Sequence, residues 1–324
     1  MIRLILLVMA VASGLIQGTS HAEPLLLQVD QVQLHTEDHT VKRVGTLRFL
    51  GGLQLKSPDT RFGGLSGLDV SDDGKRIRFV SDVGYWVQAM LRYGPAGDLA
   101  GIGDAEIGRL LAPDGKPVTR KRDADAESLA LVGSGIAVAF ERNHRVWIYP
   151  DGANPFLSRP RQLPIAPALK NAPRNKGAEA FAVLDDGSLV IVAENFPVDA
   201  PITHGWIRKD RRWLRFDYER TGLFQPTGAT VLPDGDLLVL ERRFTYIGGV
   251  ASRLTRIASA DLKPGNLVRS RELARLEPPL IVENFEGVDV RRDGQGRTLI
   301  YLVSDDNFNA LQRTLLLVFI LEPR

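Results

Sequence analysis

One short pattern occurs five times in this chain and limits the folds that the chain can adopt. Each copy has an alternating apolar stretch, a tight polar turn that usually contains Asp-Gly, a stretch rich in Leu and β-branched residues, and a final carboxylate. The copies are GLSGLDVSDDGKRIRFVSD (64–82), AESLALVGSGIAVAFE (126–141), AEAFAVLDDGSLVIVAE (178–194), PTGATVLPDGDLLVLE (226–241) and FEGVDVRRDGQGRTLIYLVSD (285–305). Alternation at a period of two indicates strands, and Asp-Gly between two such runs is a strong hairpin signal.

The spacing of these hairpins favours an all-β propeller. They begin about 50 to 60 residues apart, which is typical of propeller blades. Five copies predict five blades, and the apolar runs at 25–34 and 46–55 either close the last blade beside 314–321 or contribute to a sixth. A β-sandwich is the alternative, because sandwiches also have frequent turns.

The N-terminus predicts export. Residues 1–22 have a basic start at Arg3, a short apolar run and a small-residue site at Ser20-His21-Ala22, which together indicate a signal peptide. The apolar run is shorter than the roughly 20 residues of a membrane span, although an uncleaved anchor is the alternative. We therefore expect one domain at 23–324, periplasmic or secreted, with no membrane contact after cleavage.

Composition excludes several kinds of chemistry. The 324 residues contain no cysteine, so disulfides, cysteine nucleophiles and cysteine metal sites are ruled out. Basic and acidic residues nearly balance, at 41 and 39, and no basic stripe indicates a nucleic-acid partner. The chain also lacks a nucleophile elbow, a phosphate-binding loop and a dinucleotide fingerprint. The sequence says nothing about oligomeric state.

Acids recur at matched places in the hairpins. The start of the first strand of a hairpin faces the end of the second, so we expect five opposed pairs: Ser66 with Asp82, Glu127 with Glu141, Glu179 with Glu194, Thr227 with Glu241, and Glu286 with Asp305. Equivalent positions of successive blades surround the axis of a propeller, so these residues should face one central opening. Opposed carboxylates repel one another unless something compensates their charge.

A bound cation, neighbouring arginines or protonation can supply that compensation. Hard carboxylate oxygens suit Ca²⁺ or Mg²⁺. We therefore predict a divalent cation site, for Ca²⁺ in the first place, with the ligands Asp82, Glu141, Glu194, Glu241, Glu286 and Asp305. The alternatives are solvated acids at the blade edge, and a site held mainly by arginine–carboxylate pairs. His144 is either a turn residue or a general base.

Several strings in the chain resemble a known family. GLSGLD, AESLAL, KGAEAF, QPTGATVLPDGDLLVLERRF, NFEGVDV and SDDNF are similar to the phytase-like domain family, whose bacterial members are described as having esterase-like activity of phytase. The resemblance runs from about residue 45 to the end. It implies an exported propeller that hydrolyses a phosphate or carboxylic ester.

The chain departs from two related patterns. The R-H-G-x-R-x-P signature of histidine-acid phosphatases and the Asp-Asp-Pro-Ala string of calcium-dependent propeller phytases are both absent. A looser similarity connects Glu127, Glu179 and Glu286 with the metal-binding glutamates of six-bladed calcium-dependent lactonases.

These observations lead to one functional prediction and one alternative. We expect an exported, metal-dependent esterase or phosphoesterase that takes a small anionic or ester substrate. Glu127 or Glu179 would act as general base, and Arg142 or Arg242 would hold the anionic group. The alternative is a non-enzymatic envelope propeller that binds a ligand or a protein partner.

Overall fold

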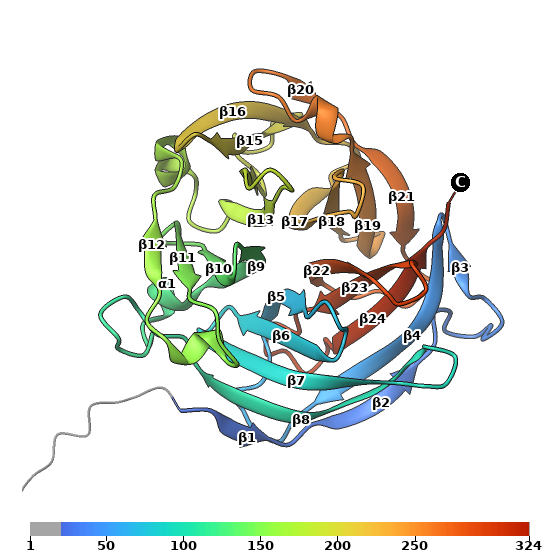
Figure 1. Ribbon diagram of the computed structural model, residues 1–324. Coiled ribbons are helices and arrows are strands. Elements are labelled where there is room, and N and C mark those ends of the chain that lie inside the picture. The colour runs from blue at the N-terminus through green and yellow to red at the C-terminus, as the bar shows by residue number, and fades with distance from the viewer. Residues whose placement is uncertain (1–20, 324) are drawn as a thin grey trace, which may run out of the picture.

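The computed structural model describes residues 21–323, which form a ring of five β-sheets (Figure 1). All but two residues of the expected leader, 1–22, therefore lie outside the described part of the chain. One strand of each sheet lines the axis, and each of these inner strands contacts the inner strands of both neighbouring sheets. The ring confirms a propeller, with five blades. Its inner strands are β5 (Leu65–Val70), β9 (Ala126–Val132), β13 (Ala178–Val183), β17 (Gln225–Val231) and β22 (Phe285–Arg292).

The outer strands follow the inner strand of each blade in antiparallel order, except that β20 is parallel to β16. Blade 1 adds β6 (Arg76–Ser81), β7 (Tyr85–Tyr93), β8 (Leu99–Arg109) and β1 (Glu23–Leu25). Blade 2 adds β10 (Gly135–Phe140), β11 (Arg145–Tyr149) and β12 (Arg161–Leu163). Blade 3 adds β14 (Leu189–Ala193), β15 (Ile202–Lys209), β16 (Arg212–Glu219) and β20 (Leu267–Val268). Blade 4 adds β18 (Leu237–Thr245), β19 (Gly249–Ile257) and β21 (Arg271–Leu276).

The fifth blade joins the two ends of the chain. It adds β23 (Thr298–Ser304), β24 (Thr314–Leu321), β4 (Leu47–Lys56) and β2 (Gln28–Val32), and β3 (Arg43–Val44) pairs with β4. Leu53 on β4 lies opposite Leu316 on β24, and both side chains are buried. This pairing confirms closure by an N-terminal strand beside the C-terminal strand. Every N-terminal strand within residues 21–323 belongs to blade 1 or blade 5, so none of them forms a sixth blade.

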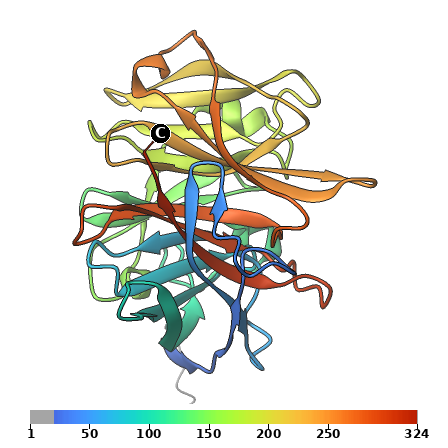
Figure 2. The same ribbon diagram turned by 90° about the vertical axis from the view of Figure 1, so that its right-hand side faces the viewer.

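The ring has two different faces. Every inner strand begins at the same end of the axis, so the loops that connect blades and the loops that follow each second strand share that end. We call it the mouth face. The β18–β19 hairpin projects from it, at the right of Figure 2. The expected Asp-Gly turns lie on the opposite face, where Gly74 and Gly187 have the positive φ values of 71° and 79° that glycine tolerates.

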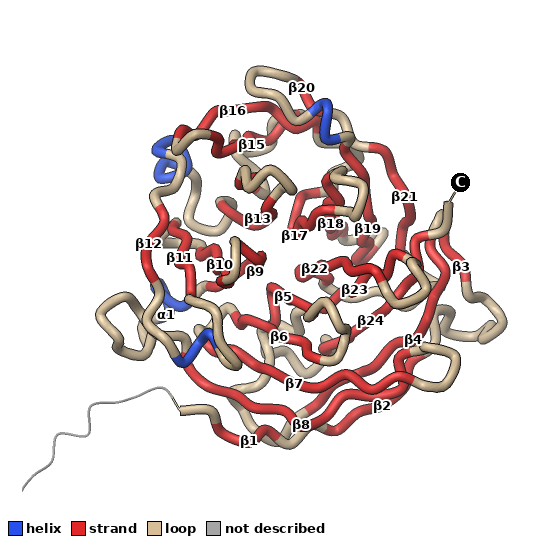
Figure 3. The backbone as a smooth tube through the Cα atoms, viewed as in Figure 1, coloured by secondary structure: helices blue, strands red, loops and turns tan. Residues whose placement is uncertain are grey.

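Helical structure is minor in the part of the chain that the structure describes (Figure 3). It consists of α1 (Lys121–Ala124) and the 3₁₀ turns η1 (Pro155–Leu157), η2 (Pro167–Asn171) and η3 (Ser259–Asp261). Within residues 21–323, no helix has the length and hydropathy to cross a bilayer.

The hydrophobic core lies between the blades, with one apolar cluster at each of the five interfaces. Strand β18 shows how the alternation of residues produces this arrangement. Leu238 and Leu240 face blade 5, whereas Leu237 and Val239 face blade 3. Because successive side chains of a strand point to opposite faces, each blade packs against both neighbours.

We expect closure of the fifth blade to control stability. Leu53→Ala removes a buried side chain from the β4–β24 pair, so it should lower the free energy of unfolding by about 2 to 5 kcal/mol in urea denaturation. Leu26→Ala, at an exposed leucine, is the control and should change it by less than about 0.5 kcal/mol. Equal effects of the two changes would contradict the role of β4.

Candidate functional site

A β-bulge recurs near the start of every inner strand. In blade 3 the register passes from Ala178 opposite Ala193 to Ala180 opposite Val192, so Glu179 has no direct partner. The same shift isolates the corresponding residue of the other four blades. These bulged residues are Ser66, Glu127, Glu179, Thr227 and Glu286. The expected direct opposition within each hairpin is therefore wrong, because a bulge places two residues of one strand against one of the other.

The residue that follows each second strand makes the true pair with the residue before the bulged strand. The backbone N–H groups of Asp82, Glu141, Glu194 and Asp305 donate to the carbonyl oxygens of Gly64, Asp125, Gly177 and Asn284. In blade 4 the equivalent residue is Arg242, which lies opposite Gln225. Four acids and one arginine thus occupy the repeat position at the mouth.

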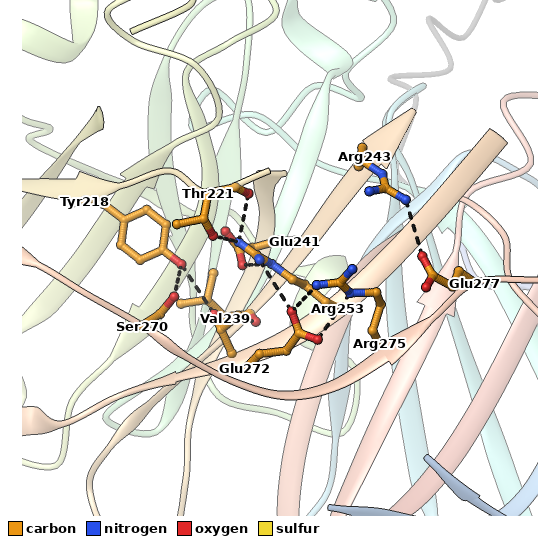
Figure 4. A network of polar contacts seen from close by, with 11 residues as sticks. Tyr218, Thr221, Val239, Glu241, Arg243, Arg253, Ser270, Glu272, Arg275 and Glu277 are labelled. Atoms are coloured by element: carbon orange, nitrogen blue, oxygen red, sulfur yellow. Dashed lines mark hydrogen bonds and ion pairs between the residues drawn. The ribbon is translucent and has the colours of Figure 1, made fainter. Parts of the chain in front are cut away.

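Glu241 does not take the repeat position, which corrects our expectation that it binds a cation with the other acids. It lies one residue earlier, opposite Arg253 in the β18–β19 ladder, and is completely buried. The Nε of Arg253 donates to its Oε2 at 2.7 Å. Arg253 also reaches Glu272 and Thr221 (Figure 4). Glu241 is therefore part of an ion-pair network inside blade 4, where a buried charge needs such a partner.

Three buried carboxylates in blade 2 form a compact acidic group. One oxygen from each of Asp125, Glu127 and Glu141 lies within 4.8 Å of the others. Arg142 donates to Asp125, and the N–H of Gly177 donates to Glu141 at 2.5 Å. We call these three residues the cation group. It unites a residue expected as a ligand, Glu141, with one expected as a base, Glu127.

Asp125 is the member that our sequence analysis missed. It precedes the repeat, at the position that Gly64, Gly177 and Asn284 take in other blades. The signal that could have found it is the Asp-Ala-Glu string at 125–127. Residues two apart in an extended chain point to the same side, so Asp125 and Glu127 belong together.

The other acids connect neighbouring blades. Glu179 of blade 3 and Glu141 of blade 2 share a side-chain hydrogen bond, which requires a proton between the two carboxyl groups. Arg242 lies 3.6 Å from Glu194 and 4.0 Å from Glu286. Asn284 donates to Glu286 at 2.8 Å. Contacts between blades, more than pairs within hairpins, therefore organise the mouth.

The sequence model of the phytase-like family, described as esterase-like activity of phytase, matches residues 60–308. The chain belongs to this family. The match covers all five hairpins and every acid of the mouth, and it confirms the resemblance seen in the sequence. A search of curated proteins finds no match.

Solved structures resemble this chain at low sequence identity. An α-L-arabinofuranosidase from Podospora anserina, solved with cellotriose, is 15% identical, with a TM-score of 0.52 over 86% of this chain and 98% of that one. A protein of unknown function from Dyadobacter fermentans is 12% identical, with a TM-score of 0.44 over 94% of each chain. At such identities the first likeness supports the fold alone.

Burial and mutual repulsion raise the pKa values of this family member's mouth acids. Burial, with the neighbouring Asp125 and Glu286, raises the pKa of Asp82 to about 7. Burial and other carboxylates raise the pKa of Glu141 to about 8 and that of Asp305 to about 9. The pKa values of Glu127 and Glu179 lie well above the usual range for the same reasons. The acids therefore retain protons near neutral pH unless a positive charge compensates them.

The residues of the mouth fit a divalent cation. All the side-chain donors of the cation group are carboxylate oxygens, the ligands that Ca²⁺ and Mg²⁺ prefer. The buried Oδ1 of Asp82 has no hydrogen-bond partner among the described residues. A cation would replace the protons that now neutralise these acids, and it would remove their mutual repulsion.

A cleft of about 1290 Å³ lies beside the cation group on blade 2. Its lining includes more basic than acidic side chains: Lys116, Arg120, Arg142, Arg145 and Lys170 against Asp114 and Asp123. Arg142 belongs to both features, since it lines the cleft and donates to Asp125. His144 also lines the cleft from the turn after β10, and burial lowers its pKa.

The raised pKa values give a pH dependence of stability. A carboxyl group whose pKa rises on folding binds more protons in the folded state, so stability falls as pH rises from the unfolded pKa, about 4, through the folded pKa. With chelator present, we expect the thermal midpoint to fall between pH 5 and pH 9. Asp305→Asn should reduce that slope, by up to about 1.4 kcal/mol per pH unit.

Asp210→Asn, at an exposed turn on the opposite face, is the matched control and should leave the slope unchanged. A wild-type midpoint that rises over this pH range would contradict the prediction.

Proposed function

We propose that this protein is an exported, divalent-cation-dependent hydrolase of phosphate or carboxylic esters that acts at the mouth of the propeller. The observation that carries the proposal is the cation group, three buried carboxylates whose oxygens approach within 4.8 Å of one another. The family match supports hydrolysis of an ester. The signal-peptide pattern at 1–22 supports export.

Asp125, Glu127 and Glu141 would hold the cation. Arg142 donates a hydrogen bond to Asp125, and the N–H of Gly177 donates to one oxygen of Glu141, so these neighbours orient the two carboxylates. The cation would polarise an ester oxygen and lower the pKa of water. Ca²⁺ remains our first choice, because a group of several carboxylates suits its flexible coordination.

Glu179 is the residue that we assign to proton transfer. It lies outside the cation group, and its hydrogen bond to Glu141 places its carboxyl beside that group. During hydrolysis the oxygen of water would bond to the carbon or phosphorus atom while the bond to the leaving alcohol breaks. Glu179 would accept the proton of the water and return it to the alcohol oxygen. Glu127, the other base expected from the sequence, would bind the cation as a ligand instead.

Arg142 and the basic cleft would bind the anionic part of the substrate. A guanidinium group matches phosphate and carboxylate oxygens in bidentate geometry. Arg142 connects the cleft with the cation group, so a substrate held there presents its ester bond to Asp125 and its neighbours. Arg242 lies 3.6 Å from Glu194, so its main role would be to compensate the negative charge of the mouth acids.

Cation binding should stabilise the folded protein. A ligand that binds only the folded state adds about 2.7 kcal/mol at a concentration of 100 times its Kd. We expect Ca²⁺ to raise the thermal midpoint of EDTA-treated wild type, and Glu141→Gln to weaken this response at least tenfold in Ca²⁺ concentration. Glu37→Gln, at a remote exposed glutamate, should respond like wild type. Midpoints that no divalent ion shifts would contradict the cation site.

Glu179 should affect turnover more than cation binding. Loss of a general base typically lowers kcat about 10²- to 10⁴-fold. We expect Glu179→Gln to show such a loss with p-nitrophenyl phosphate or p-nitrophenyl butyrate, whichever the wild type hydrolyses, while its Ca²⁺ response stays within a few-fold of wild type. Full activity in this variant would exclude Glu179 as the base. Inactivity of the wild type on both ester classes would contradict the proposed function.

A further inference from the structure

One blade breaks the acidic pattern of the mouth. In four blades an acid pairs with the residue before the bulged strand: Asp82, Glu141, Glu194 and Asp305. Blade 4 has Arg242 at the equivalent position, opposite Gln225. The bulged residue of the same blade is Thr227, so blade 4 supplies no carboxylate at either repeat position. A positive charge therefore lies where the pattern of the other blades predicts a fifth acid.

Arg242 lies between two carboxylates of the neighbouring blades. Its Nη2 is 3.6 Å from an oxygen of Glu194 in blade 3 and 4.0 Å from an oxygen of Glu286 in blade 5. Both distances exceed those of directional hydrogen bonds. By contrast, Arg253 donates to Glu241 at 2.7 Å elsewhere in blade 4 (Figure 4). Arg242 therefore acts on its two carboxylates through charge, as an ion held between them would.

The two carboxylates have other neighbours that hold them in place. Asn284 donates to Glu286 at 2.8 Å. With its amide oriented to satisfy both ends, Gln225 donates to Glu194 at 2.8 Å and accepts from Asn195 at 3.3 Å. The side chains of Glu194 and Glu286 are only 11% and 12% exposed, so water screens their charges little. Without the guanidinium, two oriented carboxylates would face each other with their repulsion uncompensated.

These two carboxylates also border the cation group. Burial raises the pKa of Glu127, and Glu286 is the charged neighbour that raises it most. Burial also raises the pKa of Glu141, and Glu194 is among the charged neighbours that raise it further. Burial raises the pKa of Glu194 as well, and Arg242 is the neighbour that opposes this most. Arg242 thus compensates acids that act directly on two members of the cation group.

We propose that Arg242 is a tethered cation that limits the mouth to one divalent ion, because its guanidinium occupies the position between Glu194 and Glu286 that a second ion would take. Hydrolases with two ions hold them about 3.5–4 Å apart and use them as a pair. A guanidinium stays charged at any pH at which the protein is folded, so it supplies a fixed second positive charge. This inference rests on the cation group of the proposed function, and it adds that hydrolysis uses one ion beside a guanidinium.

The number of bound Ca²⁺ ions tests this proposal in the full chain. Isothermal titration calorimetry of the EDTA-treated and dialysed protein counts the ions without any substrate. We expect wild type to bind one Ca²⁺ per chain and Arg242→Glu to bind two, since the substitution supplies the acid that the other four blades have. Glu141→Gln combined with Arg242→Glu should lose the first site and keep the second.

Three further variants separate the charge of Arg242 from its packing. Arg242→Lys should still bind one ion, because the ammonium group keeps the positive charge. Arg243→Gln removes the next arginine, which pairs with Glu277 at 3.3 Å, and should bind one ion like wild type (Figure 4). Arg242→Gln should bind two ions, the second more weakly than Arg242→Glu does, and it provides the same test if the added acid prevents folding.

Two results would overturn this inference and leave the proposed cation group intact. One is a wild type that binds two ions. The other is an Arg242→Gln protein, folded by circular dichroism, that binds only one. A wild type that binds no Ca²⁺ would instead overturn the inference together with the cation site of the proposed function.

Discussion

The crowding of five inner strands around one axis governs the chemistry of this protein. The blades cannot move apart, because an apolar cluster fills each of the five interfaces between them. Repulsion between acids at the mouth therefore cannot relax by separation. Only a proton, an arginine or a cation can relieve it, and the first two are already used at Glu179 and Arg242. Folding thus holds these acids so close together that they keep protons at a pH where the same residues in an open chain would be ionised.

Most of the fold could be predicted from the sequence, because it depends on local signals that recur. Alternating apolar residues and Asp-Gly turns mark each hairpin, and the apolar runs at the two ends of the chain mark the closing strands. The site could be predicted less completely from the sequence. A bulge changes the register by one residue without any compositional signal. In blade 4, moreover, Glu241 lies one residue closer to the Asp-Gly turn than Glu194 does in blade 3, so Arg242 takes the place expected for Glu241. The hydrogen bond between Glu141 and Glu179 joins two blades, and hairpin geometry contains no information about it.

Arg142 shows how the backbone adapts to the site. Its φ of +53° is rare for a residue with a Cβ atom, and its N–H donates to the carbonyl of Arg174 at 2.9 Å. This conformation directs its guanidinium to Asp125 at the edge of the basic cleft. Strained backbone often persists at functional sites because the surrounding structure compensates its cost. The two features that we assign to cation and substrate therefore meet at one residue.

The pairing of β4 with β24 also has a consequence for synthesis of the chain. Leu47–Lys56 leaves the ribosome long before its partner Thr314–Leu321 is made. Until β24 is made, the first four blades cannot close into a ring, and one edge of β4 remains unpaired. Unpaired strand edges invite association with other chains. The nascent chain is therefore exposed to aggregation until Thr314–Leu321 emerges, and factors that shield β4 would have most effect before that point.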